Sequence, residues 1–572
     1  MLSKNTYYSM NIDNIFLIEK NKNIFYKIKN YIIKRITSIK GSEYLNTFIL
    51  GDSSYIRNNV LESYRVNGIS HLFSVSGMHI TLLSSLILYI LNKIKKSNYN
   101  YLFTILFLIF YMILTNFTPS VIRATFLFIL ITINKLLKLN ISTLKILIII
   151  FLINIIINPY NVYNIGFKFS YIISIYLIIF NKIINRNKNY ILKVLTTSFI
   201  SFLASIPILI NNYFSINIMT IFNNILFVPL ISIIIFPFSL IVLLIPQLDF
   251  LFQILINILE KISLIISSFR LEIILSKVNI IIIIFYYFLI SFILYKFYKR
   301  KYKYLLLLII ILFIHTNFNY IKTNFNITFI DVNQGDSTLI QFPYNESNIL
   351  IDTGGKYNYN ISINTINYLK SIGIKKLNYM IITHGDFDHM GEAINLVENF
   401  KVEKVIFNCG EFNELEQDLI KVLDNKKIPY YSCIKELNII DNKLYFLNNK
   451  DYGNENDNSS VIYTELNNHK FLFMGDAGIE IEDDLIQKYN LQDIDVLKVG
   501  HHGSKTSSSK AFIDQINQKY SIISVGKNNR YGHPNKEVLE NLDDSKIYRT
   551  DHDASIIFKI KNNKLNIETC SP

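Results

Sequence analysis

The stretch with the densest chemistry is residues 383–389, Thr-His-Gly-Asp-Phe-Asp-His, which contains two histidines and two aspartates. It directly follows the apolar run 379–382, whose composition predicts a buried β-strand. A strand that ends in such a cluster brings imidazole and carboxylate groups to one point. Because these groups are ligands for divalent metal ions, the pattern predicts a metal centre. The alternative is a polar loop in which the histidines fall by chance.

Further apolar runs in the second half of the chain also end near such residues. The runs and the residues that follow them are 471–474 with Asp476, 496–499 with His501 and His502, and 522–525 with His533. A site at the edge of stacked sheets needs repeated strand ends of this kind, whereas core packing would explain the strands but not their endings. Short strands from residue 326 onward, mixed with helices, predict an αβ sandwich.

The 572 residues carry a net charge of +14, but the two halves of the chain differ. Residues 1–320 hold 30 Lys and Arg against 8 Asp and Glu, whereas residues 321–572 hold 27 against 35. This change predicts two bodies joined near residue 320. The polar, basic start of the chain shows no cleavable signal peptide. The three cysteines show no metal-binding spacing and predict no disulfide framework: Cys409, Cys433 and Cys570.

The first body is predicted to lie in a membrane. Each of its apolar runs is close to the length of about 20 residues that crosses a bilayer, and no Asp or Glu occurs between Glu62 and Asp249. A soluble helical core would explain neither the number of runs nor the missing acids. Residues 23–40 predict a basic amphipathic helix that either lies at the membrane surface or packs as an ordinary surface helix. The expected spans are 69–91, 101–117, 119–137, 143–158, 162–180, 190–210, 216–245, 248–267, 279–297 and 303–316.

The basic residues between these spans fall in alternate loops, and basic loops face the cytoplasm. An even number of spans then places both ends of the chain, including everything after residue 320, on the outer side of a bacterial inner membrane. Glu260 and Lys261 lie within the run 248–267, so this segment is alternatively interfacial. The count would then need another break, at Pro229 or Pro237.

Polar residues within apolar runs are costly in lipid and are therefore candidate functional residues. These residues are His71, His79, Arg123 and Lys168. A cation that lines a water-filled path would suit an anionic passenger. Interhelical hydrogen bonds, or snorkelling of the long side chains to the interface, are the alternatives.

Residues 323–572 resemble the metallo-β-lactamase fold, and residues 40–572 as a whole resemble the ComEC family of DNA-uptake channel proteins. The motifs that carry the resemblance are 51–53, 68–79, 119–124, 329–336 and 501–507. The resemblance implies a polytopic α-helical membrane domain followed by an αββα metallo-β-lactamase-like sandwich domain. The expected domains are a short amino-terminal segment at 1–67, a channel domain of about ten helices at 68–317, and a hydrolase domain at 323–572.

Two features depart from the family pattern. Only about 65 residues precede the first span, too few for the OB-like domain and earlier helices that family members commonly carry. We expect that module to be lacking or the start to be truncated. Asp386 stands where the superfamily has a histidine, and residues 456–459 match the family's own Asn-x-x-Ser form where a further histidine is usual. Because His469 lies in an expected hairpin turn, one metal is short of an imidazole.

By resemblance, the metal ligands fall into two sets that hold two divalent ions, zinc or manganese. His384 and Asp386 hold one ion, and Asp476 bridges to the other. The ligands of the second ion are Asp388, His389 and His502. Asp388 and His501 are the expected catalytic residues, with His501 as general acid or phosphate contact. The expected contacts to substrate or DNA are Ser504, Lys505 and His533 in the hydrolase domain, and His71, His79, Arg123 and Lys168 in the membrane domain. A solvated loop is the alternative for Lys505.

The resemblance implies an inner-membrane channel for uptake of single-stranded transforming DNA, with a metal-dependent phosphodiesterase that degrades the other strand. Two alternatives stay open: a DNA channel with a catalytically degenerate metallo domain, and a membrane-tethered hydrolase of envelope phosphodiesters. The sequence contains no Gly-x-x-x-x-Gly-Lys-Ser/Thr motif, so a helicase-like ATPase is an expected partner. A competence DNA receptor is a second expected partner, and the chain is compatible with a homodimer.

Overall fold

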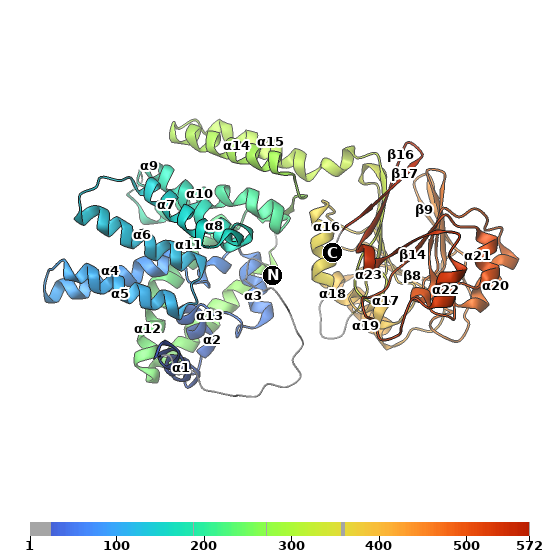
Figure 1. Cartoon of the computed structure of the whole chain (residues 1–572), viewed down its shortest axis with the longest axis horizontal. Coiled ribbons are helices and arrows are strands. Elements are labelled where there is room, and N and C mark those ends of the chain that lie inside the picture. Colours follow the sequence, from blue (N-terminus) through green and yellow to red (C-terminus); the bar gives the residue numbers. More distant parts are fainter. Residues whose placement is uncertain (1–23, 187, 270, 356–360, 571–572) are drawn as a thin grey trace. The chain divides into compact units, whose positions relative to one another are not determined.

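The computed structural model describes residues 24–186, 188–269, 271–355 and 361–570. The chain forms two compact units (Figure 1). The first unit ends at Ile310 and the second begins at Ile311, except that the short segment Ile274–Lys277 belongs with the second.

Apolar helices build almost all of the first unit. Six helices of the described chain are long and apolar enough to cross a membrane: Ser70–Ile94, Pro119–Leu136, Tyr190–Asn212, Thr220–Leu244, Pro246–Ser268 and Ile280–Tyr298. Four apolar helices are shorter: Tyr99–Leu114, Thr143–Ile157, Ile165–Ile179 and Tyr302–Thr316. At most half of any long helix is buried inside the protein. So much outward apolar surface fits lipid and not water, which makes the chain a membrane protein.

Three short helices precede the first long one: α1 (Ile24–Thr37), α2 (Ser42–Leu45) and α3 (Asn58–Val66). The first corresponds to the predicted basic amphipathic helix. The third packs along α13 (Asp249–Ser268), the helix that carries Glu260. Glu260 accepts a hydrogen bond from the Tyr44 hydroxyl at 2.8 Å and pairs with Arg57. The acid that interrupts this apolar run therefore has polar partners within the unit.

Two β-sheets form the centre of the second unit. The first has the order β17-β16-β3-β4-β5-β6-β7-β8. Its strands are β3 (Phe325–Phe329), β4 (Thr338–Gln341), β5 (Asn348–Ile351), β6 (Tyr379–Ile381), β7 (Val405–Phe407), β8 (Tyr430–Ser432), β16 (Ile556–Lys561) and β17 (Lys564–Thr569). The second has the order β15-β14-β13-β12-β11-β10-β9. Its strands are β9 (Glu436–Ile439), β10 (Asn442–Phe446), β11 (Ile462–Leu466), β12 (His469–Phe473), β13 (Val496–Lys498), β14 (Tyr520–Ile523) and β15 (Lys546–Arg549).

The second unit has four layers, in which each sheet is covered by helices on its outer face. Alternate side chains of a strand point to opposite faces of its sheet. In β5, Ile349 and Ile351 point into the core between the sheets, whereas Leu350 points to the outer face. Helices α16 (Ser362–Ser371), α18 (Ala393–Asn399) and α19 (Glu414–Lys426) cover that outer face. Helices α20 (Ile479–Lys488), α21 (Lys510–Ile516) and α22 (Lys536–Asn541) cover the other sheet in the same way. The predicted αββα sandwich after a polytopic helical domain is confirmed.

The topology brings the chemically active segments to one edge of the sandwich. Strands β5 to β8 are parallel to one another in the first sheet, as are β12 to β15 in the second. The segments that follow β6, β12 and β13 hold the predicted ligands. Because the carboxyl ends of neighbouring parallel strands lie at the same edge, ligands far apart in sequence converge there.

Candidate metal centre

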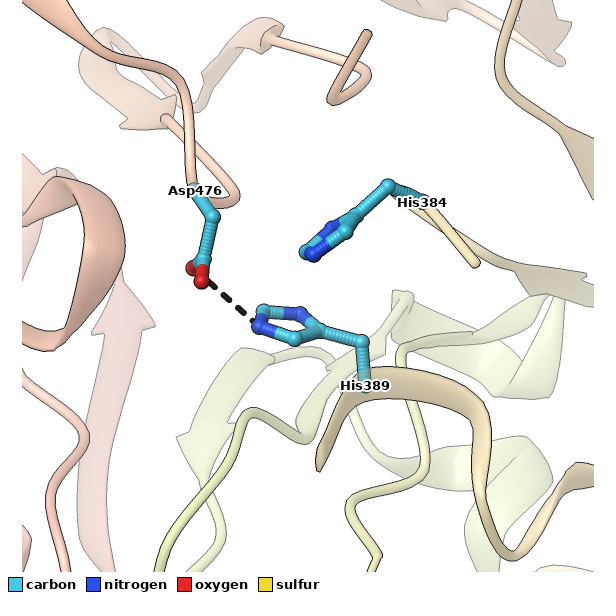
Figure 2. A group of neighbouring side chains, drawn as sticks. All are labelled: His384, His389 and Asp476. Atoms are coloured by element: carbon cyan, nitrogen blue, oxygen red, sulfur yellow. Dashed lines mark ion pairs between the residues drawn. The ribbon is translucent and has the colours of Figure 1, made fainter. Parts of the chain in front are cut away.

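His384, His389 and Asp476 face one another beyond the ends of β6 and β12 (Figure 2). One donor atom of each lies within 4.8 Å of the others. Nε2 of His389 is 3.1 Å from a carboxylate oxygen of Asp476, yet neither atom makes a hydrogen bond within the described protein. Nε2 of His384 is also without one. Buried polar atoms in this state are costly unless a cation lies among them. The three residues are therefore suited to bind divalent metal.

Asp352 holds the ring of His389 from behind. Nδ1 of His389 lies 2.9 Å from Oδ2 of Asp352. Thr383 donates hydrogen bonds to the same carboxylate from its backbone N–H at 2.8 Å and its hydroxyl at 2.7 Å. A carboxylate behind a metal-binding histidine fixes the ring orientation and the tautomer. Sequence reasoning assigned Asp352 no role.

Ser459 orients the other side of this group. Its hydroxyl lies 3.2 Å from Nδ1 of His384 and accepts a hydrogen bond from the backbone N–H of Asp476 at 3.0 Å. Ser459 ends the Asn-x-x-Ser segment 456–459. This segment therefore positions His384 and Asp476. It lies where the superfamily is expected to supply a further histidine.

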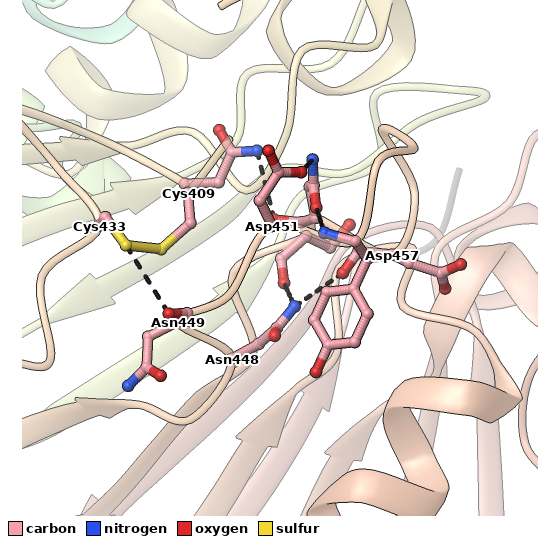
Figure 3. Close-up of a disulfide and its surroundings, with 10 residues drawn as sticks. Cys409, Cys433, Asn448, Asn449, Asp451 and Asp457 are labelled. Carbon is pink, nitrogen blue, oxygen red and sulfur yellow. Dashed lines mark hydrogen bonds between the residues drawn. A yellow bond between two sulfur atoms is a disulfide. The ribbon is translucent and has the colours of Figure 1, made fainter. Parts of the chain in front are cut away.

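The loop that leads to Ser459 is connected to a disulfide between Cys409 and Cys433 (Figure 3). The prediction that the cysteines form no disulfide framework is therefore wrong. The two cysteines follow β7 and β8, which are parallel neighbours, so their Cα atoms come within 4.4 Å despite a separation of 24 residues. Asn408 donates a hydrogen bond to the carbonyl oxygen of Asn458 at 3.2 Å, which connects the disulfide to the site loop.

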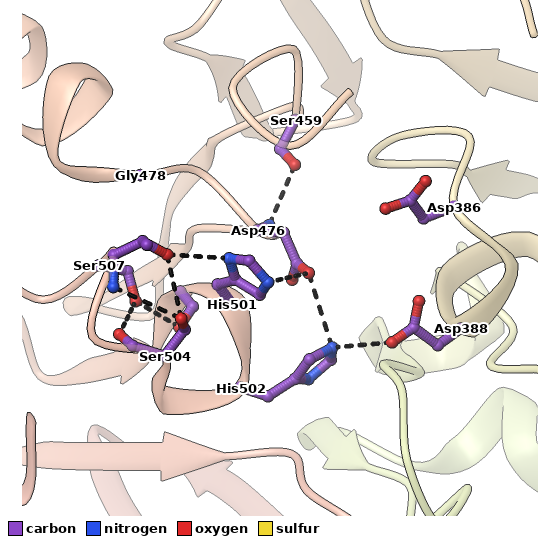
Figure 4. A network of polar contacts seen from close by, with 12 residues as sticks. Asp386, Asp388, Ser459, Asp476, Gly478, His501, His502, Ser504 and Ser507 are labelled. Atoms are coloured by element: carbon purple, nitrogen blue, oxygen red, sulfur yellow. Dashed lines mark hydrogen bonds and ion pairs between the residues drawn. The ribbon is translucent and has the colours of Figure 1, made fainter. Parts of the chain in front are cut away.

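Asp388, His389 and His502 form a second group whose donor atoms lie within 4.8 Å of one another. Nε2 of His502 is 3.3 Å from Asp388 and 3.6 Å from Asp476 (Figure 4). Nδ1 of His502 donates a hydrogen bond to the carbonyl oxygen of Ser524 at 2.9 Å, which directs Nε2 into the site. Because both groups contain His389, the two candidate metal positions are adjacent.

The electrostatics of the centre also favour cations. Burial lowers the pKa of His502, but the carboxylates of Asp476 and Asp336 outweigh it and raise that pKa to about 10. The same competition raises the pKa of His389 well above its usual value, with burial opposed by Asp476 and Asp352. Without metal, the carboxylates thus favour the protonated form of both imidazoles. A metal ion would take the place of these protons.

Asp336 and Lys498 form a buried ion pair beside the second group, and sequence reasoning assigned neither a role. The two side chains are 5% and 3% exposed. Nζ of Lys498 also donates to the carbonyl oxygen of Gly475 at 3.0 Å, and a carboxylate oxygen of Asp336 lies 3.5 Å from Nδ1 of His502. Burial raises the pKa of Asp336, but Lys498 and His502 outweigh it and lower that pKa below its usual range.

Asp386 and His501 lie at the rim of the centre. Asp386 has a side chain that is 47% exposed, with Oδ2 3.6 Å from Nε2 of His384, and it stands outside both buried groups. Nε2 of His501 lies 3.9 Å from Asp476, and its Nδ1 lies 3.2 Å from the Thr506 hydroxyl. Burial lowers the pKa of His501, which favours the neutral form of its ring.

The three predicted substrate contacts differ in setting. The ring of His533 lies 6.0 Å from that of His501, measured between centroids. Lys505 is exposed. Ser504 is buried, and its hydroxyl lies 3.0 Å from that of Thr506. Ser504 therefore shapes the loop around His501, whereas Lys505 is exposed and His533 is half-buried.

In the first unit, His71 and His79 have separate surroundings. Nδ1 of His71 lies 3.1 Å from the carbonyl oxygen of Gly68. His79 lies on α4 (Gly77–Ile94) with no exposed surface, its Nδ1 3.0 Å from the hydroxyl of Ser76 and its ring packed on Phe236. His79 therefore takes part in capping the N-terminus of α4 inside the apolar core.

Arg123 lies near the start of one helix and bonds to the middle of another. It lies on α6 (Pro119–Leu136) and donates to the carbonyl oxygen of Ser170 and the hydroxyl of Ser174 on α8 (Ile165–Ile179), which also carries Lys168. A Cβ on Gly77 would lie only 2.7 Å from the guanidinium, so glycine leaves room for this close approach. The contacts to α8 show that Arg123 makes interhelical hydrogen bonds. The sequence alone left such bonds as the alternative to a cation that lines a water-filled path.

Comparisons with known proteins follow the two units. The family model "Competence protein" matches residues 48–300, and that of the "Metallo-beta-lactamase superfamily" matches residues 330–527. ComE operon protein 3 of Bacillus subtilis is 28% identical over 550 residues, covering 90% of this chain and 70% of that protein. The chain belongs to the ComEC family of competence proteins. The metallo-β-lactamase domain makes the second unit a metal-binding hydrolase domain by family.

Other relatives match part of the chain. Recombination protein 2 of Haemophilus influenzae is 29% identical over 39% of this chain and 27% of that protein. Competence protein ComA of Neisseria gonorrhoeae is 27% identical over 41% of this chain and 32% of that protein. Among solved structures, a metallo hydrolase of Ignicoccus hospitalis aligns at 12% identity with a TM-score of 0.27, covering 41% of this chain and all of that one. CmlA, a diiron β-hydroxylase of Streptomyces venezuelae, aligns at 10% identity with a TM-score of 0.29, covering 41% of this chain and 54% of that one.

Proposed function

We propose that this ComEC-family chain takes up single-stranded transforming DNA through a bacterial inner membrane and degrades the other strand with its metallo-β-lactamase domain. The observation that carries the nuclease proposal is the convergence of two donor groups that share the buried His389 and contain atoms without hydrogen bonds. Duplex DNA is too wide and too charged for a modest helical pore, so one strand must first be removed. The joining of a hydrolase to an apolar helical unit in one chain supports this division of labour.

His384 and Asp386 are proposed to hold one ion, with Asp476 as the bridging ligand. The second ion is proposed to bind Asp388, His389 and His502. Two divalent ions in this site would lower the pKa of a bound water and neutralise the charge on a phosphodiester. The mixed imidazole and carboxylate donors suit zinc or manganese.

His501 is proposed to contact the scissile phosphate. The Thr506 hydroxyl, 3.2 Å from Nδ1, can donate to it, so that the neutral ring keeps its proton on Nε2. That N–H then donates a hydrogen bond to a phosphate oxygen. Lys505 and His533 are proposed to contact the substrate further from the metals. In this scheme Asp388 holds a metal next to the reacting phosphate.

The hydrolase domain is proposed to lie on the extracytoplasmic side. The alternation of basic loops predicts this side, and the Cys409–Cys433 disulfide supports it independently. Disulfides persist in oxidising compartments and are rare in the cytosol, where thiols are kept reduced. A domain outside the membrane would meet incoming DNA before the translocated strand reaches the cytoplasm.

The DNA path is proposed to pass the membrane unit near Arg123, with His71, His79 and Lys168 as further candidates. The surplus of basic residues in the first 320 positions suits a polyanion. A competence DNA receptor would deliver the duplex, and a helicase-like ATPase would pull the strand inside.

Two experiments test the proposal. The full chain, purified in detergent and loaded with manganese or zinc, is expected to hydrolyse DNA, and Asp388→Ala is expected to abolish this. Bound metal without cleavage by the wild type would favour the degenerate-domain alternative. In the host, deletion of the gene is expected to abolish uptake of labelled DNA. Undiminished uptake would contradict the channel and favour an envelope hydrolase.

A further inference from the structure

A ladder of rings runs outward from the candidate metal centre. The His502 and His501 rings lie 6.3 Å apart, and the His501 and His533 rings lie 6.0 Å apart. The ladder continues to Tyr531, whose ring is nearly parallel to that of His533 at 5.8 Å and an interplanar angle of 12°. The guanidinium of Arg530 lies 4.8 Å from the centre of the Tyr531 ring. The outer end of the ladder is open, because Tyr531 is 53% exposed.

The loop that carries these residues, 526–535, is held by its own hydrogen bonds. Asn529 accepts from the backbone N–H groups of Tyr531 and His533 at 3.1 and 3.0 Å. Its amide group donates to the carbonyl oxygen of His533 at 2.7 Å. The backbone N–H of Asn535 donates to the carbonyl oxygen of Gly503 at 2.8 Å, which ties the loop to the segment of His501 and His502. The ladder is therefore fixed to the centre.

The outer end of the ladder is basic, although the second half of the chain is acidic overall. The loop 526–535 contains one lysine, one arginine and no acid, and Lys505 of the neighbouring loop is also exposed. Positive charge attracts a phosphate backbone, but it does not explain an exposed tyrosine. Aromatic rings and guanidinium planes next to a phosphodiester centre are the elements on which nucleobases stack.

We propose that Tyr531, with Arg530 and His533, forms a base-stacking platform that holds a single-stranded nucleic acid across the metal centre. This inference rests on the proposed nuclease function and names its substrate as a base-bearing strand. A base stacks on the outer end of the ladder, and a phosphate further along the same strand reaches His501 and the metals. The platform reads no sequence, because every base has a π-face. It discriminates a nucleic acid from an envelope phosphodiester, which has no base.

The deciding test is site-specific photocrosslinking. A single-stranded oligonucleotide that carries 5-iodouracil is irradiated with the full chain in detergent and EDTA, where no turnover occurs. Mass spectrometry is expected to find the adduct on Tyr531. The exposed Tyr445 of β10 is the control and is expected to stay unmodified. Adducts elsewhere, or no adduct on Tyr531, would overturn the proposal whether or not the protein is a nuclease.

A kinetic test separates the platform from the chemistry. With metal bound, kcat/KM is measured for an oligonucleotide and for an abasic strand of the same length. Tyr531→Ala is expected to lower the ratio of kcat/KM for the oligonucleotide to kcat/KM for the abasic strand about 10-fold. Tyr531→Phe and Tyr445→Ala are expected to leave this ratio unchanged. An unchanged ratio in Tyr531→Ala overturns the platform and leaves the nuclease intact. Hydrolysis of neither strand by the wild type contradicts the nuclease, and the crosslink then decides the platform alone.

Discussion

The ion pair between Lys498 and Asp336 offers a sharp test of how the candidate metal centre is held together. In Lys498→Met the chain keeps a long apolar side chain but leaves Asp336 as a buried charge without its main partner. Breaking a buried pair in this way costs about 3–5 kcal/mol. Nδ1 of His502, 3.5 Å from Asp336, offers partial compensation. We therefore expect the lower end of that range, about 3 kcal/mol.

The assay is urea unfolding of the second unit within the full chain, followed by brief proteolysis in detergent and EDTA. With an m-value of about 3 kcal/mol per molar urea, a loss of about 3 kcal/mol lowers the midpoint by about 1 M. The double variant with Asp336→Asn removes both charges and is expected to recover at least half of that loss. Lys510→Met is the control, because its pair with Asp514 is exposed and is worth less than about 1 kcal/mol.

Two results would refute this reasoning. If the urea midpoint of Lys498→Met moves no more than that of the Lys510→Met control, Asp336 is solvated or protonated in the folded protein. A double variant no more stable than Lys498→Met would show that Lys498 acts through its packing or its bond to Gly475, and not through Asp336.

Four further outcomes are expected. Asp388→Ala, which removes a ligand from one donor group only, lowers the bound metal from about two ions to about one by elemental analysis; an unchanged content excludes it as a ligand. Cys409→Ser lowers the unfolding free energy by about 3 kcal/mol, as expected for a loop of this length, in non-reducing urea titrations. Cys570, which is free and exposed, reacts with a membrane-impermeant maleimide in intact cells if its domain is outside, and stays unlabelled if it is cytoplasmic. Burial, then the nearby Glu455 and Asp386, raise the pKa of Glu416 to about 7. A carboxyl group with a raised pKa in the folded protein lowers the stability as pH rises from about 4.5 to 7. Glu416→Gln is therefore expected to be stabilising at about pH 8 and to have little effect at about pH 4, as measured by the same urea titration.

The sequence predicts the parts of this centre that local pattern controls. A buried strand followed by polar residues is visible in a few residues, so His384, Asp476 and His502 can be found without a structure. The contact between Asp336 and Lys498 depends on how two distant segments meet, and a lysine within an apolar strand has no local signature. The same holds for Cys409 and Cys433, since only the pairing of β7 with β8 brings them together.

The charges at the centre bear on how many ions the proposed site holds. Five aspartates surround it, and one lysine is buried with them: Asp336, Asp352, Asp386, Asp388, Asp476 and Lys498. If the histidines are neutral, one divalent ion and the lysine would leave two of the five negative charges uncompensated. This is costly in a largely buried site. Two divalent ions and the lysine balance the five carboxylates. Asp386 in place of a histidine supplies one of these charges at the rim. The substitution therefore favours two-ion occupancy and a harder ion such as manganese.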